Sequence, residues 1–262
     1  SSSGSSVSGT VSYSNKVATF TPSSNLSYST TYTATITTGV KDISGNAMSS
    51  AYTWSFTTSS APDTTAPLGS VTINSGASYT NSTAVTLNLS ATDSVGVVGY
   101  YASTSSSTPT ASASGWNSVT SATSYSGSVS YTLASGDEQK TVYVWFKDAA
   151  GNVSSTASDN IVLDTTAPIV TINSPTSSDT YTTTSNPLSL SGSASDSSSG
   201  VKKVIWSSDK GGSGTASGTT SWSVSSINLS NGDNTITVTA TDGAGNTSTD
   251  TLTITYNPIT AV

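Results

Sequence analysis

The residues of this sequence best suited to chemistry are aspartates that recur at matching places along the chain. Asp63 and Asp164 each begin the segment Asp-Thr-Thr-Ala-Pro, and the two copies lie 101 residues apart. A second motif, Asp-x-x-Gly-Asn, begins at Asp42, Asp148 and Asp242. Carboxylate and amide oxygens are hard ligands, and Ca²⁺ takes roughly six to eight such oxygens. Calcium binding is therefore the first chemistry to consider.

The composition argues against catalysis. The 262 residues include no Cys, no His and no Arg. A hydrolase triad needs a base such as His beside the nucleophile, and zinc sites prefer Cys and His. Thirteen Asp and one Glu, Glu138, could supply a pair of glycosidase carboxyls, but they sit in repeated turns. Repetition is expected of structure rather than of an active site, so we predict that the protein is not an enzyme.

The charge of the chain limits its partners. The formal net charge is −7, which argues against binding to nucleic acid or to an anionic membrane surface. No apolar run approaches the ~18–20 residues that a membrane-spanning helix needs. We therefore expect neither nucleic acid nor membrane insertion.

The elements that hold the aspartates in place are predicted to be strands in tandem modules. A period of about a hundred residues indicates whole domains in tandem. Val, Ile, Tyr and Trp alternate with Ser and Thr between turns, which is typical of an all-β Greek-key sandwich. The predicted modules are module one (residues 1–62), module two (63–163) and module three (164–262).

Period-2 alternation predicts the strands individually. They are residues 10–13, 17–20, 32–38 and 52–57 in module one; 69–73, 84–91, 97–102, 124–133, 140–147 and 158–163 in module two; and 169–172, 188–194, 201–206, 220–227, 234–241 and 250–256 in module three. Residues 103–114 and 207–218 read as loops. Leu26 followed by Tyr32 is typical of a tyrosine corner, in which a Tyr hydroxyl ties down a loop.

Several motifs carry a family resemblance. In modules two and three they are Asp164 to Pro168, Gly96-Val97, Gly136-Asp137, Tyr143 to Trp145 and Lys147 to Asn152; in module one they are Leu26 to Tyr32, Lys41 to Asn46 and Trp54 to Thr57. Through them the chain resembles the bacterial Ig-like repeats of large secreted and cell-surface proteins. That resemblance implies tandem Ig-like sandwiches, a surface location and, in the calcium-stiffened adhesins among these families, Ca²⁺ at the joints.

Sandwich topology predicts that the repeated acidic residues gather. The first strand of an Ig sandwich starts at the same pole as the B–C and F–G turns. Two metal-binding sets are therefore expected, one per module: Asp63, Asp93, Asp148 and Asn152, and Asp164, Asp196, Asp242 and Asn246. The alternative is that Asp and Asn cap their own turns without a metal. Lys147 and Lys41, next to two of these Asp residues, would weaken a cation site if they pointed toward it.

A row of aromatic residues suggests a second kind of site. In the strand at 140–147 the alternation places Val142, Val144 and Phe146 inward. Tyr143 and Trp145 then point outward, and Tyr101 on the neighbouring strand joins them. Such a row could stack on a sugar or contact a protein, which makes Tyr101, Tyr143 and Trp145 candidate ligand-binding residues. The alternative is that the loop 103–114 folds over them.

Module one looks incomplete. The repeat is 101 residues long, yet 62 residues precede Asp63, and Asp42 marks the F–G turn. Two explanations remain open: the sequence is a fragment of a longer protein, or another copy supplies the missing strands. In the second case the donor would be residues 250–262, through Leu252 and Ile254. Such head-to-tail contact builds a fibre.

The sequence thus favours a non-catalytic extracellular structural protein: a stalk or filament segment at a bacterial surface, with a potential adhesive role. Ca²⁺ would be a structural cofactor. The competing hypothesis is a glycan- or ligand-binding module that uses the aromatic face of module two.

Overall fold

The computed structural model describes residues 6–259, and all the regular structure in that range is β-strand. The chain divides into two compact units, Ser1–Thr64 and Thr65–Val262. The second unit holds two separate hydrophobic cores, one between Val71 and Ile161 and the other between Val170 and Ile254. These cores lie on either side of the division predicted at 163/164. Within residues 6–259 no helix is long and apolar enough to cross a membrane.

The first unit consists of two separate antiparallel hairpins. Strand β1 (Gly9–Ser14) pairs with β2 (Val17–Pro22), and β3 (Thr31–Ile36) pairs with β4 (Tyr52–Thr57). The Tyr32 hydroxyl accepts a hydrogen bond from the Ser27 N–H at 3.0 Å, which confirms the tyrosine corner. None of the residues described in this unit is buried. Two separate two-stranded sheets cannot bury an apolar face between them as two packed layers do, which accounts for this exposure.

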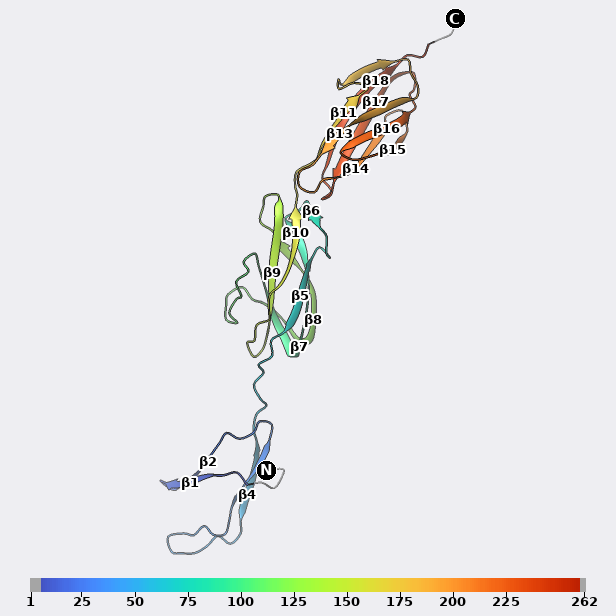
Figure 1. Cartoon of the computed structure of the whole chain (residues 1–262). Coiled ribbons are helices and arrows are strands. Elements are labelled where there is room, and N and C mark those ends of the chain that lie inside the picture. Colours follow the sequence, from blue (N-terminus) through green and yellow to red (C-terminus); the bar gives the residue numbers. More distant parts are fainter. Residues whose placement is uncertain (1–5, 260–262) are drawn as a thin grey trace. The chain divides into compact units, whose positions relative to one another are not determined.

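Module two is built around one long, bent strand (Figure 1). The structure gives β5 (Leu68–Ile73), β6 (Tyr79–Thr80), β7 (Ala84–Ser103), β8 (Asn117–Thr132), β9 (Glu138–Asp148) and β10 (Ala157–Leu163). Strand β8 pairs with both halves of β7, whereas β5 pairs only with the first half and β9 only with the second. We predicted two strands, 84–91 and 97–102. They join because the intervening turn becomes a register shift between Thr92 and Val97, with Gly96 at φ 127°.

Module three is a two-layer sandwich, coloured orange to red in Figure 1. Its strands are β11 (Ile169–Ser174), β12 (Thr180–Thr183), β13 (Leu188–Ser195), β14 (Val201–Ser208), β15 (Ser213–Thr215), β16 (Ser221–Ile227), β17 (Gly232–Asp242) and β18 (Thr247–Tyr256). One sheet has the order β11-β13-β16 and the other β12-β18-β17-β14-β15. Trp222, Ile236, Val238 and Leu252 fill the space between them, each 1% exposed or less. Ig-like sandwich topology is thus present, as predicted.

Strand β18, the last strand of the sandwich, includes most of the residues that we considered as a strand donor to another copy. Strand β18 pairs with β17 and with β12, and its Leu252 and Ile254 lie in the core of module three. These residues are therefore not available to complete module one of another copy, contrary to the donor that we considered. Of the remaining donor residues, 260–262 lie outside the described range.

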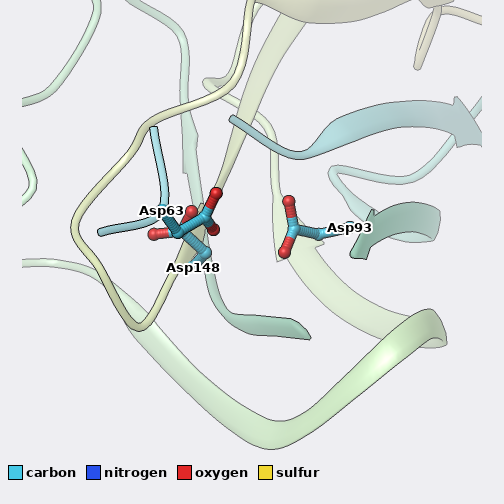
Figure 2. A group of neighbouring side chains, drawn as sticks. All are labelled: Asp63, Asp93 and Asp148. Atoms are coloured by element: carbon cyan, nitrogen blue, oxygen red, sulfur yellow. The ribbon is translucent and has the colours of Figure 1, made fainter. Parts of the chain in front are cut away.

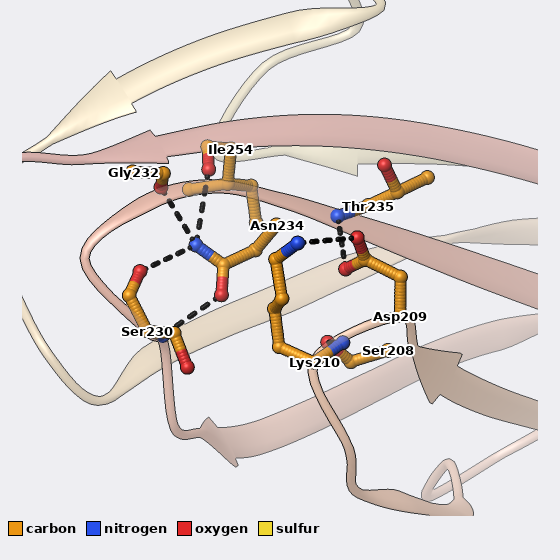
Figure 3. A network of polar contacts seen from close by, with 8 residues as sticks. All are labelled: Ser208, Asp209, Lys210, Ser230, Gly232, Asn234, Thr235 and Ile254. Carbon is orange, nitrogen blue, oxygen red and sulfur yellow. Dashed lines mark hydrogen bonds and ion pairs between the residues drawn. The ribbon is translucent and has the colours of Figure 1, made fainter.

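A buried amide fixes the connection that leads into β17 (Figure 3). The Asn234 side chain is fully buried, and its amide nitrogen donates to the carbonyls of Ser230 at 2.8 Å, Gly232 at 2.9 Å and Ile254 at 3.3 Å. Its oxygen accepts from the Ser230 N–H at 2.8 Å. Beside it, Asp209 accepts from the Thr235 N–H at 2.7 Å. Because a buried polar group must be paired, this network determines where β17 begins and hence where its far end, Asp242, lies.

Candidate functional site

The structure brings the predicted aspartates together in two groups of three. Asp63, Asp93 and Asp148 each offer a carboxylate oxygen, and these oxygens lie within 4.8 Å of one another (Figure 2). The module-three group, Asp164, Asp196 and Asp242, meets the same distance. We call these the first and the second aspartate group. Closely spaced carboxylates of this kind repel one another unless donors or a cation compensate their charge.

The Asp-x-x-Gly-Asn motif forms the same capped turn in both groups. Asp148 Oδ1 accepts from the Gly151 and Asn152 N–H groups at 2.8 and 2.9 Å. Asp242 Oδ1 likewise accepts from Gly245 at 2.6 Å and Asn246 at 2.8 Å. The glycines have φ values of 94° and 100°, which side chains disfavour. Turn capping is therefore confirmed for these aspartates.

The two asparagines of the motif act as donors in this structure. The Asn152 amide nitrogen donates to Asp148 Oδ2 at 2.7 Å, and that of Asn246 donates to Asp242 Oδ2 at 2.8 Å. Asn246 also donates to the carbonyls of Asp164 at 2.9 Å and Thr166 at 3.2 Å. The sequence interpretation counted both asparagines as metal ligands. Here they hold carboxylates, and Asn246 in addition holds the segment that enters module three.

Asp93 occupies the bend of β7, and one of its oxygens has no hydrogen-bond donor. Its Oδ1 accepts from the Val95 and Gly96 N–H groups, both at 2.8 Å. Its Oδ2 is buried and accepts no hydrogen bond. The residue is 8% exposed. A buried, unpaired carboxylate oxygen is costly, so this atom is the one in the first group that most needs a positive partner.

The second group is closed by a serine. Asp164 is fully buried, and its Oδ2 accepts from the Ser199 N–H at 3.1 Å and from the Ser199 hydroxyl. The Ser199 oxygen in turn accepts from the Ala244 N–H at 3.1 Å. Asp196 Oδ1 accepts from three successive N–H groups of its turn, those of Ser198, Ser199 and Gly200. Sequence reasoning missed Ser199, although its place directly before Gly200 was visible.

The positive charge of Lys147, next to Asp148 in the sequence, does not neutralise the carboxylates of the first aspartate group. Burial raises the pKa of Asp148, and hydrogen bonds from Asn152 and Gly151 outweigh that effect, so the pKa lies below its usual value. Lys147 turns away from the group: its Nζ donates to the Ala111 carbonyl at 3.0 Å and lies 4.8 Å from the centre of the Trp116 ring. Lys147 would weaken a cation site only if it pointed toward that site, and in this structure it points elsewhere.

Asp137, at the other end of module two, fixes the linker into module three. Its Oδ1 accepts from the Thr165 N–H at 2.9 Å and hydroxyl at 2.8 Å, and its Oδ2 accepts from the Thr166 hydroxyl at 2.6 Å. The Asp164 N–H donates to the Thr80 carbonyl at 2.9 Å. Together with Asn246, these bonds tie the linker to the residues before it and after it. The recurrence of Gly136-Asp137 as Gly232-Asp233 was the available signal for this role.

The predicted aromatic face is largely covered. The strand register was right, because Val142, Val144 and Phe146 lie in the core with no exposed surface. Trp145 was predicted to point to solvent, but it too has no exposed surface, and its Nε1 donates to the Thr156 hydroxyl at 3.0 Å.

Other aromatic side chains explain the burial of Trp145. Its ring lies 6.2 Å from that of Tyr101 and 6.4 Å from that of Tyr143, both of which are half-buried. Trp116, which follows the long loop, packs edge-on against Tyr101 at 5.7 Å. The reading in which a loop folds over the row is thus the one that the structure favours, and we do not propose Trp145 as a sugar-stacking platform.

Comparison with known proteins identifies the domain type. Residues 1–58 match a family model described as a bacterial Ig-like domain, and residues 168–238 match one described as a bacterial Ig domain. No curated protein matches the chain significantly.

Solved structures of low sequence identity resemble the chain. The fibronectin(III)-like modules of Clostridium thermocellum CbhA are 15% identical and cover 72% of this chain and 94% of their own, with a TM-score of 0.43. The D00-D0 domain of intimin is 10% identical, covers 71% and 99%, and has a TM-score of 0.34. A tetra-tandem repeat of a large adhesion protein is 22% identical with a TM-score of 0.32, covering 87% of this chain and 56% of its own. The two family matches show that the chain carries bacterial Ig-like domains at residues 1–58 and 168–238, and the strands described above form an all-β, Ig-like fold.

Proposed function

We propose that this chain is a non-catalytic structural segment of an extracellular bacterial protein, a stalk that spaces or presents another part at the cell surface. The observation that carries the proposal is the fixed linker between modules two and three. Asp137 holds Thr165 and Thr166 from one side, and Asn246 holds the carbonyls of Asp164 and Thr166 from the other. A spacer needs joints that keep their direction under load.

The physical argument rests on how little freedom the linker retains. Asp137 accepts three hydrogen bonds from the linker, and the negative charge of the acceptor makes each of them shorter and stronger than a bond between neutral groups. Pro168 restricts the backbone further, because its ring fixes φ near −65°. Few free torsions remain between Asp164 and Pro168, so module three should follow the orientation of module two.

Distance measurements between spin labels test the rigid joint. The sequence has no Cys, so the exposed positions Ser126→Cys and Thr249→Cys place one label in each module of the full chain. We expect one narrow distance distribution, which Asp137→Ala should broaden. Asp179→Ala, at an exposed position away from the linker, is the matched control and should leave the distribution narrow. A broad distribution in the unmodified protein would overturn the rigid joint.

The proposed location is tested in the organism that makes the protein. Protease added to intact cells should remove the protein or release fragments of it into the medium, while a cytoplasmic marker stays intact. Full protection of the chain until the cells are lysed would contradict an extracellular role.

We further propose that Ca²⁺ is a structural cofactor at an aspartate group. Three carboxylates with oxygens within 4.8 Å are suited to a hard cation, and carbonyls and water can complete its coordination. Support comes from the buried Asp93 Oδ2, which accepts no hydrogen bond. A bound ion stabilises the folded state by mass action, so the thermal midpoint of the full chain should rise with Ca²⁺ and fall again with EDTA. An unchanged midpoint would reject calcium as a cofactor.

A further inference from the structure

The two aspartate groups share their motif but differ in how their carboxylates are satisfied. In the second group, Asp164 Oδ2 accepts from both the backbone and the hydroxyl of Ser199. In the first group, Asp93 Oδ2 accepts no hydrogen bond although it is buried. A buried carboxylate oxygen needs either donors or a cation. In the second group the protein itself supplies the donors that Asp164 Oδ2 needs, whereas in the first group Asp93 Oδ2 is left without a donor.

The turns that carry Asp93 and Asp196 also differ in the residue before their glycine. In module three Asp196 is followed by Gly200 four residues later, and Ser199 precedes the glycine. In module two Asp93 is followed by Gly96 three positions later, and Val95 precedes the glycine. Val95 is 56% exposed, and its side chain has no donor. The residue before the glycine thus has a hydroxyl donor in the second group and none in the first.

Ser199 also does what a bridging cation does. Its hydroxyl donates to the carboxylate of Asp164, which begins the linker, and its oxygen accepts from Ala244 in the turn of Asp242. It thereby links the start of the module to the F–G turn. A cation among three carboxylates would connect the same elements through its coordination sphere.

We propose that the two groups have different occupants: the first binds a divalent cation of the Ca²⁺ class, whereas the Ser199 hydroxyl replaces the cation in the second. The chain then has one calcium-dependent turn cluster and one that needs no metal. This inference rests on the proposed calcium cofactor and adds where the ion binds and which residue decides it.

Calcium titration calorimetry of the full chain, freed of metal beforehand, tests the proposal. The unmodified protein should bind one Ca²⁺, and Asp93→Asn should bind none. Asn keeps an oxygen for the Val95 and Gly96 N–H groups, so the turn remains capped. Asp196→Asn, the matched change in the second group, should still bind one. Mg²⁺ in place of Ca²⁺ should give a weaker signal, because Mg²⁺ gives up its water reluctantly.

Ser199→Ala is the decisive variant. It leaves Asp164 Oδ2 without the hydroxyl donor, and a second binding event should appear. Ser198→Ala, an exposed neighbour whose backbone N–H serves Asp196, should keep one event. This inference would be overturned if the unmodified protein bound two ions, or if Asp93→Asn still bound one. Either result would leave the proposal of calcium as a cofactor intact. No binding at all would reject the cofactor itself. A single event in Ser199→Ala would exclude the serine as the determinant.

Discussion

Modules two and three contain the same turn and the same three aspartates, and they differ in the residues around them. In module two the turn partner Asp93 has a buried oxygen without a donor, while in module three Ser199 serves the buried Asp164. The outer face of the equivalent strand differs too, with Trp145 buried in module two and Thr239 half-buried in module three. The repeated motif thus determines the backbone, and non-repeated neighbours determine what the site can bind.

The copy of the turn in the first unit supports this distinction. Asp42 accepts from the Ser44 and Asn46 N–H groups, both at 2.9 Å, and from the Asn46 amide at 3.0 Å. These bonds, led by that of the Asn46 side chain, keep the pKa of the Asp42 carboxyl below its usual value. Asp42 is exposed and belongs to neither aspartate group. The turn alone therefore needs no cation.

The largest expected effect is on the free energy of unfolding, and it comes from a substitution on the outer face of module two compared with the equivalent one in module three. Trp145→Ala should destabilise module two by about 3–5 kcal/mol, the usual cost of removing a buried large aromatic side chain. Thr239→Ala should change the free energy of unfolding of module three by less than about 1 kcal/mol. Urea denaturation of the full chain, followed by circular dichroism, measures both. A cost below about 1 kcal/mol for Trp145→Ala would mean that its environment is not packed.

Calcium should stabilise module two next most strongly. At a free concentration of 100 times the dissociation constant, one bound ion adds about 2.7 kcal/mol, which corresponds to several degrees in Tm for a domain of this size. Asp93→Asn should lose this increment and, in EDTA, should be at least as stable as the unmodified protein, because it removes a buried charge. A variant that is less stable in EDTA would show that the charge is compensated without a metal.

Ser199→Ala should cost module three less, about 1–3 kcal/mol in EDTA, because a buried carboxylate oxygen loses one of its donors. Added Ca²⁺ should restore part of the loss. Val95→Ala in module two is the matched control, and since Val95 is 56% exposed, it should change stability by about 0.5 kcal/mol or less. If Ser199→Ala and Val95→Ala changed the free energy of unfolding equally, the proposed difference between the two aspartate groups would be wrong.

The smallest effect concerns pH at the linker. Hydrogen bonds from the Thr166 hydroxyl and from Thr165 lower the pKa of the Asp137 carboxyl. A lowered folded-state pKa gives stability that is complete above the unfolded value, about 3.9, and is lost as pH falls through the folded value. The label distance distribution of the unmodified protein should broaden as pH falls through the lowered pKa of Asp137, toward that of Asp137→Asn at neutral pH. A difference between the two proteins that persists unchanged at the lowest pH would contradict this linkage.

Much of the fold was predictable because alternation reports which side of a strand is buried. The alternation of Ile236 and Val238 with threonine placed β17 correctly, and sandwich topology brought together three aspartates that lie far apart in sequence. The strands β6, β12 and β15 were missed, since they are two to four residues long and lack an apolar alternation.

The details of the sites depended on contacts that a sequence pattern does not contain. Burial of Trp145 follows from the packing of Tyr101 and Trp116 around it, which involves a long loop. The role of Ser199 depends on a hydrogen bond to Asp164, 35 residues earlier in the chain. Both features arise from tertiary contacts between segments whose local sequence is mostly Ser, Thr and Gly.

Hydrogen exchange measured by mass spectrometry, with and without Ca²⁺, tests the central claim most directly, because it reports each turn separately. The account predicts that Ca²⁺ slows exchange in residues 93–97 and 148–152 and leaves residues 196–200 and 242–246 unchanged. Equal protection of both pairs of turns, or protection confined to module three, would contradict it.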